Sequence, residues 1–160
     1  TIRWRMDLGD VRYSPDGRRV VLAAFDGSVV ILDAATGSVE QILQGHRDKA
    51  SSASFSPDGR LIVSTSFDGT ARLWDATTGD LRSTVRTYSK PLVDAAFSPD
   101  GASVAVLGLD GTVRQYLVRV DDLRALAERL SSRELTPEER ARFLGEAPPA
   151  SSAALPTTSP

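Results

Sequence analysis

The sequence has 160 residues, of which 41% are hydrophobic and 25% are charged, as is usual for one globular domain with a small appendage. Its formal net charge of −2 gives no field that would attract nucleic acid or an anionic membrane, and no apolar run approaches the roughly 18–20 residues that span a bilayer. The absence of cysteine excludes disulfides, thiolate chemistry and cysteine-based metal sites.

The first ten residues, TIRWRMDLGD, contain neither an initiator methionine nor the apolar region of a signal peptide. We therefore expect a piece of a longer chain with a cytoplasmic location. Arginine supplies 17 of the 19 basic residues, a bias that is a hint of bacterial origin.

Three sequence markers then recur along the chain with one period of 42 residues. The tetrapeptide SPDG begins at Ser14, Ser56 and Ser98, and an Asp-Gly pair follows at 26, 68 and 110. The third marker, DAATG at 33–37 and DATTG at 75–79, has the same spacing. Such agreement between independent markers indicates three copies of one unit within residues 1–118.

Each copy has the pattern of antiparallel strands joined by tight turns. Proline and glycine in SPDG favour a type I turn, and Asp-Gly between apolar runs favours a hairpin because both turn residues must accept positive φ. In the middle copy these signals predict strands near 50–55, 61–66, 70–75 and 81–86. The unit is therefore four antiparallel strands in 42 residues.

We expect the two outer copies to be incomplete. Counting back 42 residues from Val39–Leu43 places the outermost strand of the first copy before residue 1 for most of its length. The third copy has no ATG turn, and TVRQYLVR runs directly into VDDLRALAERL. The predicted fold class is all-β, with three four-stranded antiparallel sheets of which the outer ones are incomplete, followed by a short helical extension.

After the third copy the pattern changes from strand to helix. From Leu123 apolar residues recur at i, i+3, i+4 and i+7, and a second segment begins with Thr136 as a helix cap and ends at Gly145. We predict a two-helix extension over 119–145 and a disordered tail rich in Pro, Ser, Ala and Thr over 146–160. A DNA-binding helix pair is the alternative, but the second segment carries no basic stripe.

The chain resembles the WD40-repeat β-propeller family over residues 1–118, on the basis of the period, Gly45-His46 near the start of the middle copy and Trp74-Asp75 near its end. The resemblance implies a partial propeller whose three repeats and helical tail end a larger, bacterial signalling protein. The remaining blades of the ring would belong to the same parent chain.

In this family a histidine, a serine or threonine, an aspartate and a tryptophan of one blade form a buried hydrogen-bonded tetrad. Carried over to this sequence, the tetrad is His46, Ser64, Asp68 and Trp74. These groups can satisfy one another, because the indole only donates and the carboxylate only accepts, while the hydroxyl and imidazole do both. The outer copies have apolar or aromatic residues in place of the serine and tryptophan, namely Leu22 and Leu32, and Val106 and Tyr116.

A serine, a histidine and an aspartate are also the residues of a hydrolase triad. The sequence has no Gly-x-Ser-x-Gly elbow and no loop long enough to build an oxyanion site, and its one histidine is already placed in the tetrad. A propeller-based enzyme is further disfavoured because polar residues do not cluster at the blade centres. We therefore predict no catalytic residue, no cofactor and no metal site.

Partner contacts in the family cluster just before the tight-turn aspartate and near the start of the innermost strand. The resemblance transfers them to seven positions, Phe25, Lys49, Ser51, Phe67, Pro91, Val93 and Leu109. In the first copy Asp7 and Gly9 are the corresponding residues, where the motif matches poorly. The residues before the aspartates would form an apolar patch typical of interfaces, or they would pack against neighbouring blades; both interpretations stay open.

The resemblance implies a non-catalytic scaffold or sensor module of a signalling protein, which binds protein partners and neither nucleic acid nor membranes. The alternative is a structural domain that positions an upstream NTPase or protein kinase missing from this sequence. The identity of that upstream domain would distinguish the two.

Overall fold

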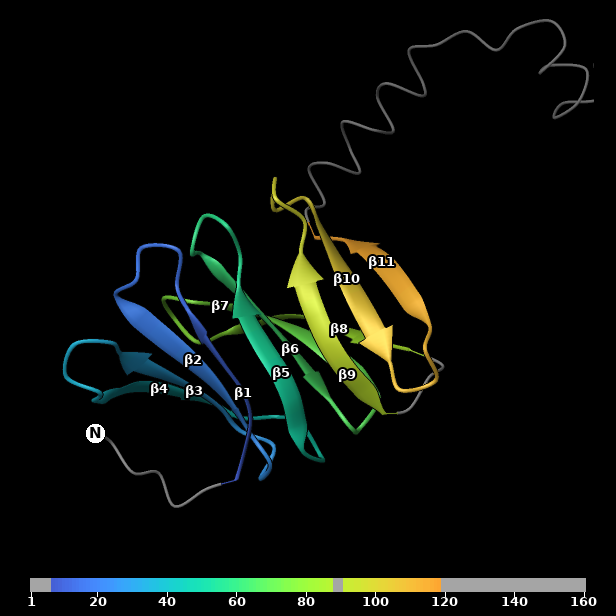
Figure 1. Cartoon of the computed structure of the whole chain (residues 1–160), viewed down its shortest axis with the longest axis horizontal. Helices are drawn as coiled ribbons and strands as arrows, with labels where there is room; N and C mark the ends of the chain where they lie inside the picture. The colour runs from blue at the N-terminus through green and yellow to red at the C-terminus, as the bar shows by residue number, and fades with distance from the viewer. Residues whose placement is uncertain (1–6, 88–90, 119–160) are drawn as a thin grey trace, which may run out of the picture. The chain divides into compact units, whose positions relative to one another are not determined.

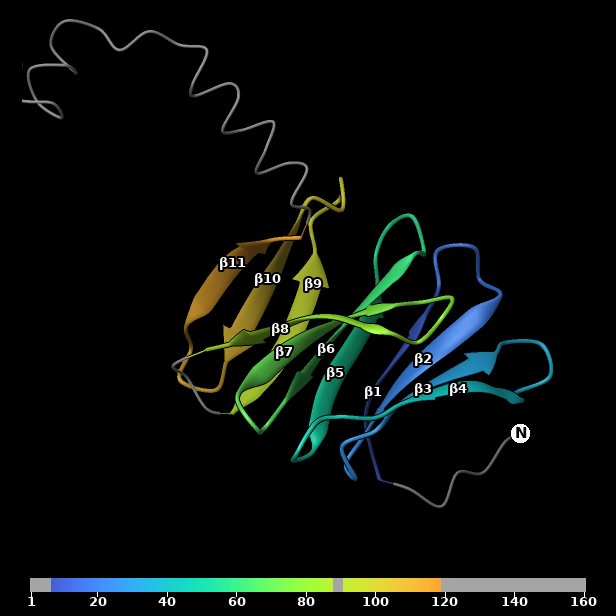
Figure 2. The same ribbon diagram turned by 180° about the vertical axis from the view of Figure 1, so that it is seen from behind.

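The computed structural model describes residues 7–87 and 91–118, which fall within one compact unit of the chain. These residues form eleven strands and no helix, arranged in two four-stranded sheets and one three-stranded sheet, all antiparallel. Figures 1 and 2 show the three sheets side by side in chain order. The predicted all-β fold of three antiparallel sheets is confirmed, whereas the predicted helices of 119–145 and the tail of 146–160 lie outside the described residues.

Each sheet is a meander in which neighbours in sequence are neighbours in the sheet. The first contains β1 (Leu8–Tyr13), β2 (Arg19–Ala24), β3 (Val29–Asp33) and β4 (Val39–Leu43). The second contains β5 (Ala50–Phe55), β6 (Leu61–Ser66), β7 (Thr70–Asp75) and β8 (Leu81–Arg86), at the residues predicted for the middle copy. The third contains β9 (Leu92–Phe97), β10 (Ser103–Gly108) and β11 (Val113–Leu117).

The repeated SPDG segments form the same turn in all three sheets. In the second sheet the Gly59 N–H donates to the Ser56 carbonyl oxygen at 2.9 Å, and Gly59 has φ of 69°, which favours glycine. The Ser56 hydroxyl donates to Asp58 at 2.6 Å and accepts from the Leu61 N–H at 2.9 Å. These hydrogen bonds fix the turn together with Leu61, the first residue of β6, which explains why the strand begins where the sequence predicts.

The first sheet is complete, and the expectation that it lacks its outermost strand was wrong. Its fourth strand is β4, which pairs Ile42 with Val30 of β3. Counting back 42 residues from the fourth strand of the middle copy, near 81–86, leads to β4, so the strand sought before residue 1 would not belong to this sheet. The third sheet has three strands in the part of the chain that the structure describes, as expected.

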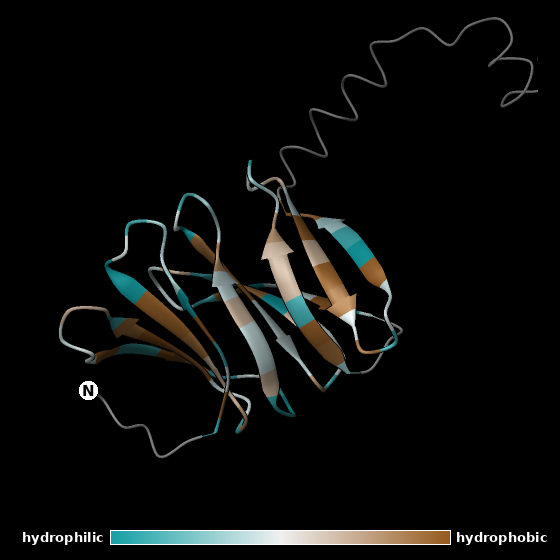
Figure 3. Ribbon diagram, viewed as in Figure 1, coloured by the Kyte–Doolittle hydropathy of each residue, from teal (hydrophilic) through white to brown (hydrophobic). Residues whose placement is uncertain are grey.

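The sheets pack face to face through two apolar layers. Between the first and second sheets lie buried side chains that include Val21, Ile31, Ile62 and Trp74. A second layer that includes Val63 and Val106 joins the second and third sheets, and Figure 3 shows the hydrophobic colouring of β2 and β10. Burial of this apolar surface is the main force that holds the sheets together, and it places β1 against β5 and β5 against β9.

Candidate functional site

Four side chains of the second sheet and the loop before it form one hydrogen-bonded chain. The Trp74 indole N–H donates to the Ser64 hydroxyl at 2.9 Å, and this hydroxyl lies 2.8 Å from Nε2 of His46. Because Ser64 accepts from the indole, its own proton can go to Nε2, which leaves the imidazole proton on Nδ1. Nδ1 lies 3.3 Å from Oδ2 of Asp68 and 3.1 Å from Oγ1 of Thr70.

The charges of this chain are fixed by its surroundings. Burial raises the pKa of Asp68, but hydrogen bonds from the Thr70 hydroxyl (2.6 Å), the Arg47 N–H (2.9 Å) and the Thr70 N–H (2.8 Å) outweigh it and lower this pKa to about 2. Burial lowers the pKa of His46, and the nearby Asp68 offsets this only in part. At neutral pH the aspartate is therefore charged and the imidazole is neutral.

The arrangement joins a loop to a sheet and leaves no room for a substrate. Ser64 has 0% of its surface exposed, and so has the side chain of His46. The loop enters through Gly45, where the φ of 152° favours glycine and an added Cβ would collide with the Arg72 guanidinium. The positions equivalent to His46 in the outer sheets, 4 and 88, lie outside the described residues.

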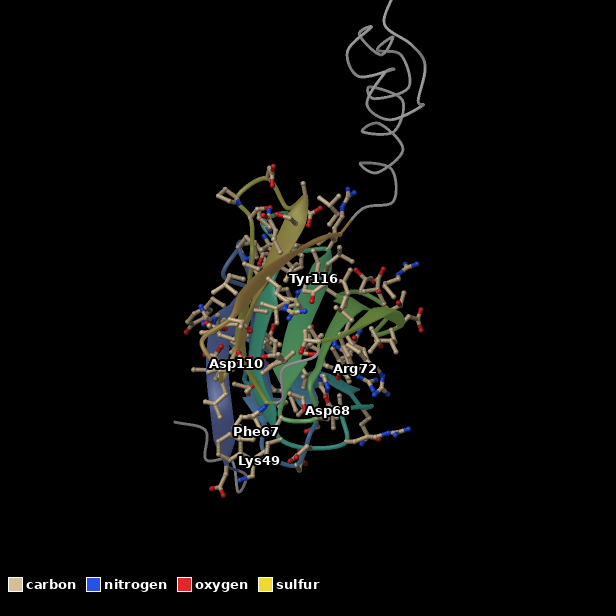
Figure 4. The ribbon with its side chains drawn as sticks, turned by 90° about the vertical axis from the view of Figure 1, so that its right-hand side faces the viewer. Lys49, Phe67, Asp68, Arg72, Asp110 and Tyr116 are labelled. Carbon is tan, nitrogen blue, oxygen red and sulfur yellow. The ribbon has the colours of Figure 1, made fainter. Side chains whose placement is uncertain are left out.

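The residues expected to contact a partner lie largely at one end of the sheets, where the Asp-Gly turns are found. Figure 4 shows Phe67 and Lys49 together at this end, whereas Tyr116 lies towards the other end. In each sheet the residue before the turn aspartate donates its N–H to the carbonyl oxygen of the residue that precedes the innermost strand. The three pairs are Phe25 with Asp7 (2.9 Å), Phe67 with Lys49 (3.0 Å) and Leu109 with Pro91 (2.9 Å).

The apolar side chains at this end are partly packed and partly open. Phe25 and Phe67 are each 38% exposed, and Leu109 is 64% exposed. The Phe25 ring rests against Gly9, where an added Cβ would lie 3.1 Å from the ring, and the Lys49 ammonium lies over the same ring at 5.1 Å. The two interpretations left open by the sequence therefore each describe part of the geometry.

Ser51 and Val93 occupy corresponding places at the start of β5 and β9. The Ser51 hydroxyl donates to the Leu92 carbonyl oxygen at 2.8 Å and lies 2.9 Å from the hydroxyl of Thr65. This serine thus bridges the second and third sheets, while Val93 is half-buried beside it.

A hollow of about 340 Å³ opens between the innermost strands at this end. Its lining includes Phe25, Phe67, Ser51 and Val93, together with a polar group of Asp10, Arg12, Ser52 and Asp94. The hollow therefore brings together expected contact residues of all three copies.

The polar group was not predicted from the sequence, and the expectation that polar residues do not cluster at the blade centres was wrong. Asp10, Ser52 and Asp94 are 42 residues apart and lie in one row, with the Ser52 hydroxyl 2.6 Å from Asp94 and 3.1 Å from Asp10. Arg12 Nε donates to Asp10 at 2.9 Å. Burial raises the pKa of Asp10, but the hydrogen bonds from the Arg12 guanidinium and the Val11 N–H outweigh it and lower this pKa. The same count of 42 could have found the row.

A comparison with known families matches two segments of the chain. The model of the WD domain, G-beta repeat, matches residues 37–75 and 79–116. The first match contains β4 to β7 and the second contains β8 to β10 and most of β11, so each begins with the outermost strand of one sheet and continues into the next. No curated protein matches the chain significantly. The described residues contain no helix of the length and apolar character that a membrane crossing requires.

Proposed function

The chain belongs to the WD40-repeat family, and we propose that it works as a non-catalytic protein-interaction module. Repeats of this family generally mediate contacts between proteins. The proposed binding surface is the Asp-Gly end of the three blades, where Phe25, Phe67 and Leu109 are exposed. In this role the chain serves as the scaffold or sensor part of a signalling protein.

The observation that carries this proposal is that the side chains of Phe25 and Phe67, both partly exposed, lie at the border of one hollow. The backbone N–H of each phenylalanine is hydrogen-bonded to the residue before the innermost strand of its own blade, so the spacing of the two residues is set by the packed sheets. Rigid frameworks that present apolar side chains at loop ends are well suited to binding, and aromatic residues covered by a partner contribute much of the binding free energy.

The tetrad supports this role by stabilising the surface. His46 lies in the loop 44–49 that contains Lys49, and Asp68 lies in the turn directly after Phe67. The hydrogen bonds between these residues hold the two loops of the middle blade together, which fixes the exposed residues on both.

Substitution of Phe67 by aspartate tests the proposal. Partners cross-linked to the full chain in cell extract would be quantified by mass spectrometry, and the melting temperature of each variant would be measured in parallel. We expect Phe67→Asp to lose the partners with its melting temperature unchanged. Leu81→Asp is the matched control, because Leu81 is 45% exposed at the start of β8, away from the Asp-Gly turns.

Equal loss of partners in both variants would place the binding surface elsewhere. A fall in melting temperature of Phe67→Asp that accounts for its lost binding would show that the ring serves packing. Either result would overturn the proposed surface.

A further inference from the structure

We propose that the hollow between the innermost strands receives a basic side chain, arginine or lysine, from the protein partner. The inference rests on the proposed function, because it names the partner chemistry at the same end of the blades. It is carried by the charges of Asp10, Arg12 and Asp94 and by the two phenylalanine rings beside them.

The residues that line the hollow carry one negative charge in excess. Asp10 and Asp94 share the single guanidinium of Arg12, which binds Asp10 at 2.9 Å but lies 3.6 Å from Oδ2 of Asp94. The second distance is beyond a good hydrogen bond, although within reach of an ion pair. Arg12 therefore neutralises Asp10 and leaves Asp94 only weakly compensated.

One oxygen of Asp94 is free to accept a further donor. Oδ1 already accepts from the Ser52 hydroxyl at 2.6 Å and from the Ala95 N–H at 2.8 Å. Within the described part of the chain, Oδ2 has only the distant Arg12 guanidinium. The Asp94 side chain is 43% exposed, so a donor from outside can reach it.

Ser52 cannot supply a donor to Oδ2 of Asp94. Its hydroxyl lies within hydrogen-bond distance of both carboxylates but has a single proton, and the shorter distance shows that this proton goes to Asp94 Oδ1. A cationic donor between the two carboxylates would therefore gain a charge-assisted hydrogen bond without displacing an existing one.

The aromatic rings suit the rest of a basic side chain. The Lys49 ammonium over Phe25, at 5.1 Å, shows that a ring at this border accepts a cation on its face. In the next blade the residue that corresponds to Lys49 is Pro91, which carries no charge, and no described cation lies over Phe67. The methylene groups of an incoming arginine or lysine can pack on that ring while its charged end reaches Asp94.

Other occupants fit less well. An anionic group would meet two carboxylates, and a purely apolar group would bury their charges without replacing the lost water. A divalent cation would find only the carboxylates of Asp10 and Asp94, and the described residues contain no group of three or more His, Cys, Asp or Glu that could hold a metal ion. Charge complementarity thus selects a monovalent basic side chain.

The test uses the full chain and a synthetic heptapeptide library in which one position at a time is fixed as arginine, lysine, citrulline, glutamate or leucine. Peptides retained by the immobilised chain would be identified, and the affinity of the best one measured by fluorescence anisotropy. We expect selection of arginine or lysine at one position. Replacing that residue by citrulline, which keeps the shape of arginine without its charge, should weaken binding roughly tenfold.

Two variants locate the effect in the hollow. Asp94→Asn keeps an acceptor for Ser52 and Ala95 but removes the charge, and it should weaken the basic peptide roughly tenfold and leave the citrulline peptide unchanged. Asp80→Asn removes the same charge from an exposed position before β8 and should change neither affinity. Unchanged melting temperatures would show that both variants fold.

The inference is overturned if no peptide is retained, if the selected peptides lack a basic residue, or if Asp94→Asn and Asp80→Asn have equal effects. Its failure can be told from failure of the proposed function. If the retained peptides show no preference for a basic residue, and Phe67→Asp releases them while Asp94→Asn does not, the inference is refuted and the proposed function stands. Peptides that neither substitution releases would refute both.

Discussion

The guanidinium of Arg19 donates a hydrogen bond of 2.7 Å to the carbonyl oxygen of Ala76, and this contact joins the first blade to the second. A second N–H of the same group lies 3.1 Å from the Gly59 carbonyl oxygen, and the guanidinium lies over the Phe55 ring at 5.2 Å. The equivalent positions of the other two repeats carry Leu61 and Ser103, which cannot make this contact. The clamp is thus specific to one pair of blades.

Replacing Arg19 by leucine should lower the free energy of unfolding by about 2 kcal/mol. The substitution adopts the residue of the next repeat but leaves two part-buried carbonyl groups without their charged donor. Urea unfolding of the full chain measures the change, and Arg18→Leu, at an exposed neighbouring position, is the control. Equal losses in both variants would contradict a clamp.

Ser64→Ala should destabilise the middle blade by roughly 1–3 kcal/mol, because it leaves both the Trp74 N–H and Nε2 of His46 without a partner in a buried site. Ser54→Ala is the control, since Ser54 is also buried but makes one hydrogen bond, to the Ala95 carbonyl oxygen. The loss from Ser64→Ala should be the larger of the two. A double-mutant cycle with His46→Ala should also show coupling, and additive losses would mean that the tetrad does not act as a unit.

The stability of the chain should fall as the pH drops below about 6.5, the ordinary pKa of histidine. Burial lowers the pKa of His46 in the folded state, so in this range the unfolded state binds a proton that the folded state does not. The stabilisation is therefore complete above this pKa and is lost as the pH falls towards the lower, folded value. Urea unfolding between pH 5 and 8 should show the slope in the wild type and a weaker one in His46→Gln.

A further loss belongs to Asp68, whose pKa of about 2 lies below its ordinary value of 3.8. Its contribution should be complete above the ordinary value and disappear as the pH falls through the lower one. For the His46 prediction, the contradicting result would be the same dependence of the unfolding free energy on pH in the wild type and in His46→Gln between pH 5 and 8.

Gly9→Ala should destabilise the junction between the first two blades. An added Cβ would lie 2.8 Å from the carbonyl oxygens of both Ala50 and Ser51, so β1 and β5 would have to move apart. Gly59→Ala is the comparison, because the nearest neighbour of the added Cβ would be 3.8 Å away and its cost of about 1–2 kcal/mol comes from positive φ alone. We expect the larger loss of unfolding free energy for Gly9→Ala, and the reverse order would refute a tight junction.

Sequence reasoning predicted most of the local structure because the turns carry their own chemistry. The serine, aspartate and glycine of each SPDG segment bond to one another, so they form the same turn wherever they occur. The same reasoning pointed to His46, Ser64, Asp68 and Trp74, whose side chains lie in one hydrogen-bonded chain.

What sequence reasoning missed depends on contacts between blades. Asp10, Ser52 and Asp94 come together only because successive innermost strands lie side by side in register, and the reach of Arg19 depends on how two sheets pack. The membership of β4 was misjudged for a different reason, because the count of 42 was started from β4 itself and not from the fourth strand of the middle copy. The period of 42 shows which residues are equivalent, but it does not show which side chains of neighbouring sheets touch.

The offset of β4 has a consequence for how such a chain can lengthen. The block of residues that the family model matches and the block that packs as a sheet are out of phase by one strand. The first strand of a new repeat inserted in this frame would complete the preceding sheet, and the first strand of the repeat after it would complete the new sheet. Gene duplication can therefore extend the array without creating an unpaired sheet edge in its interior.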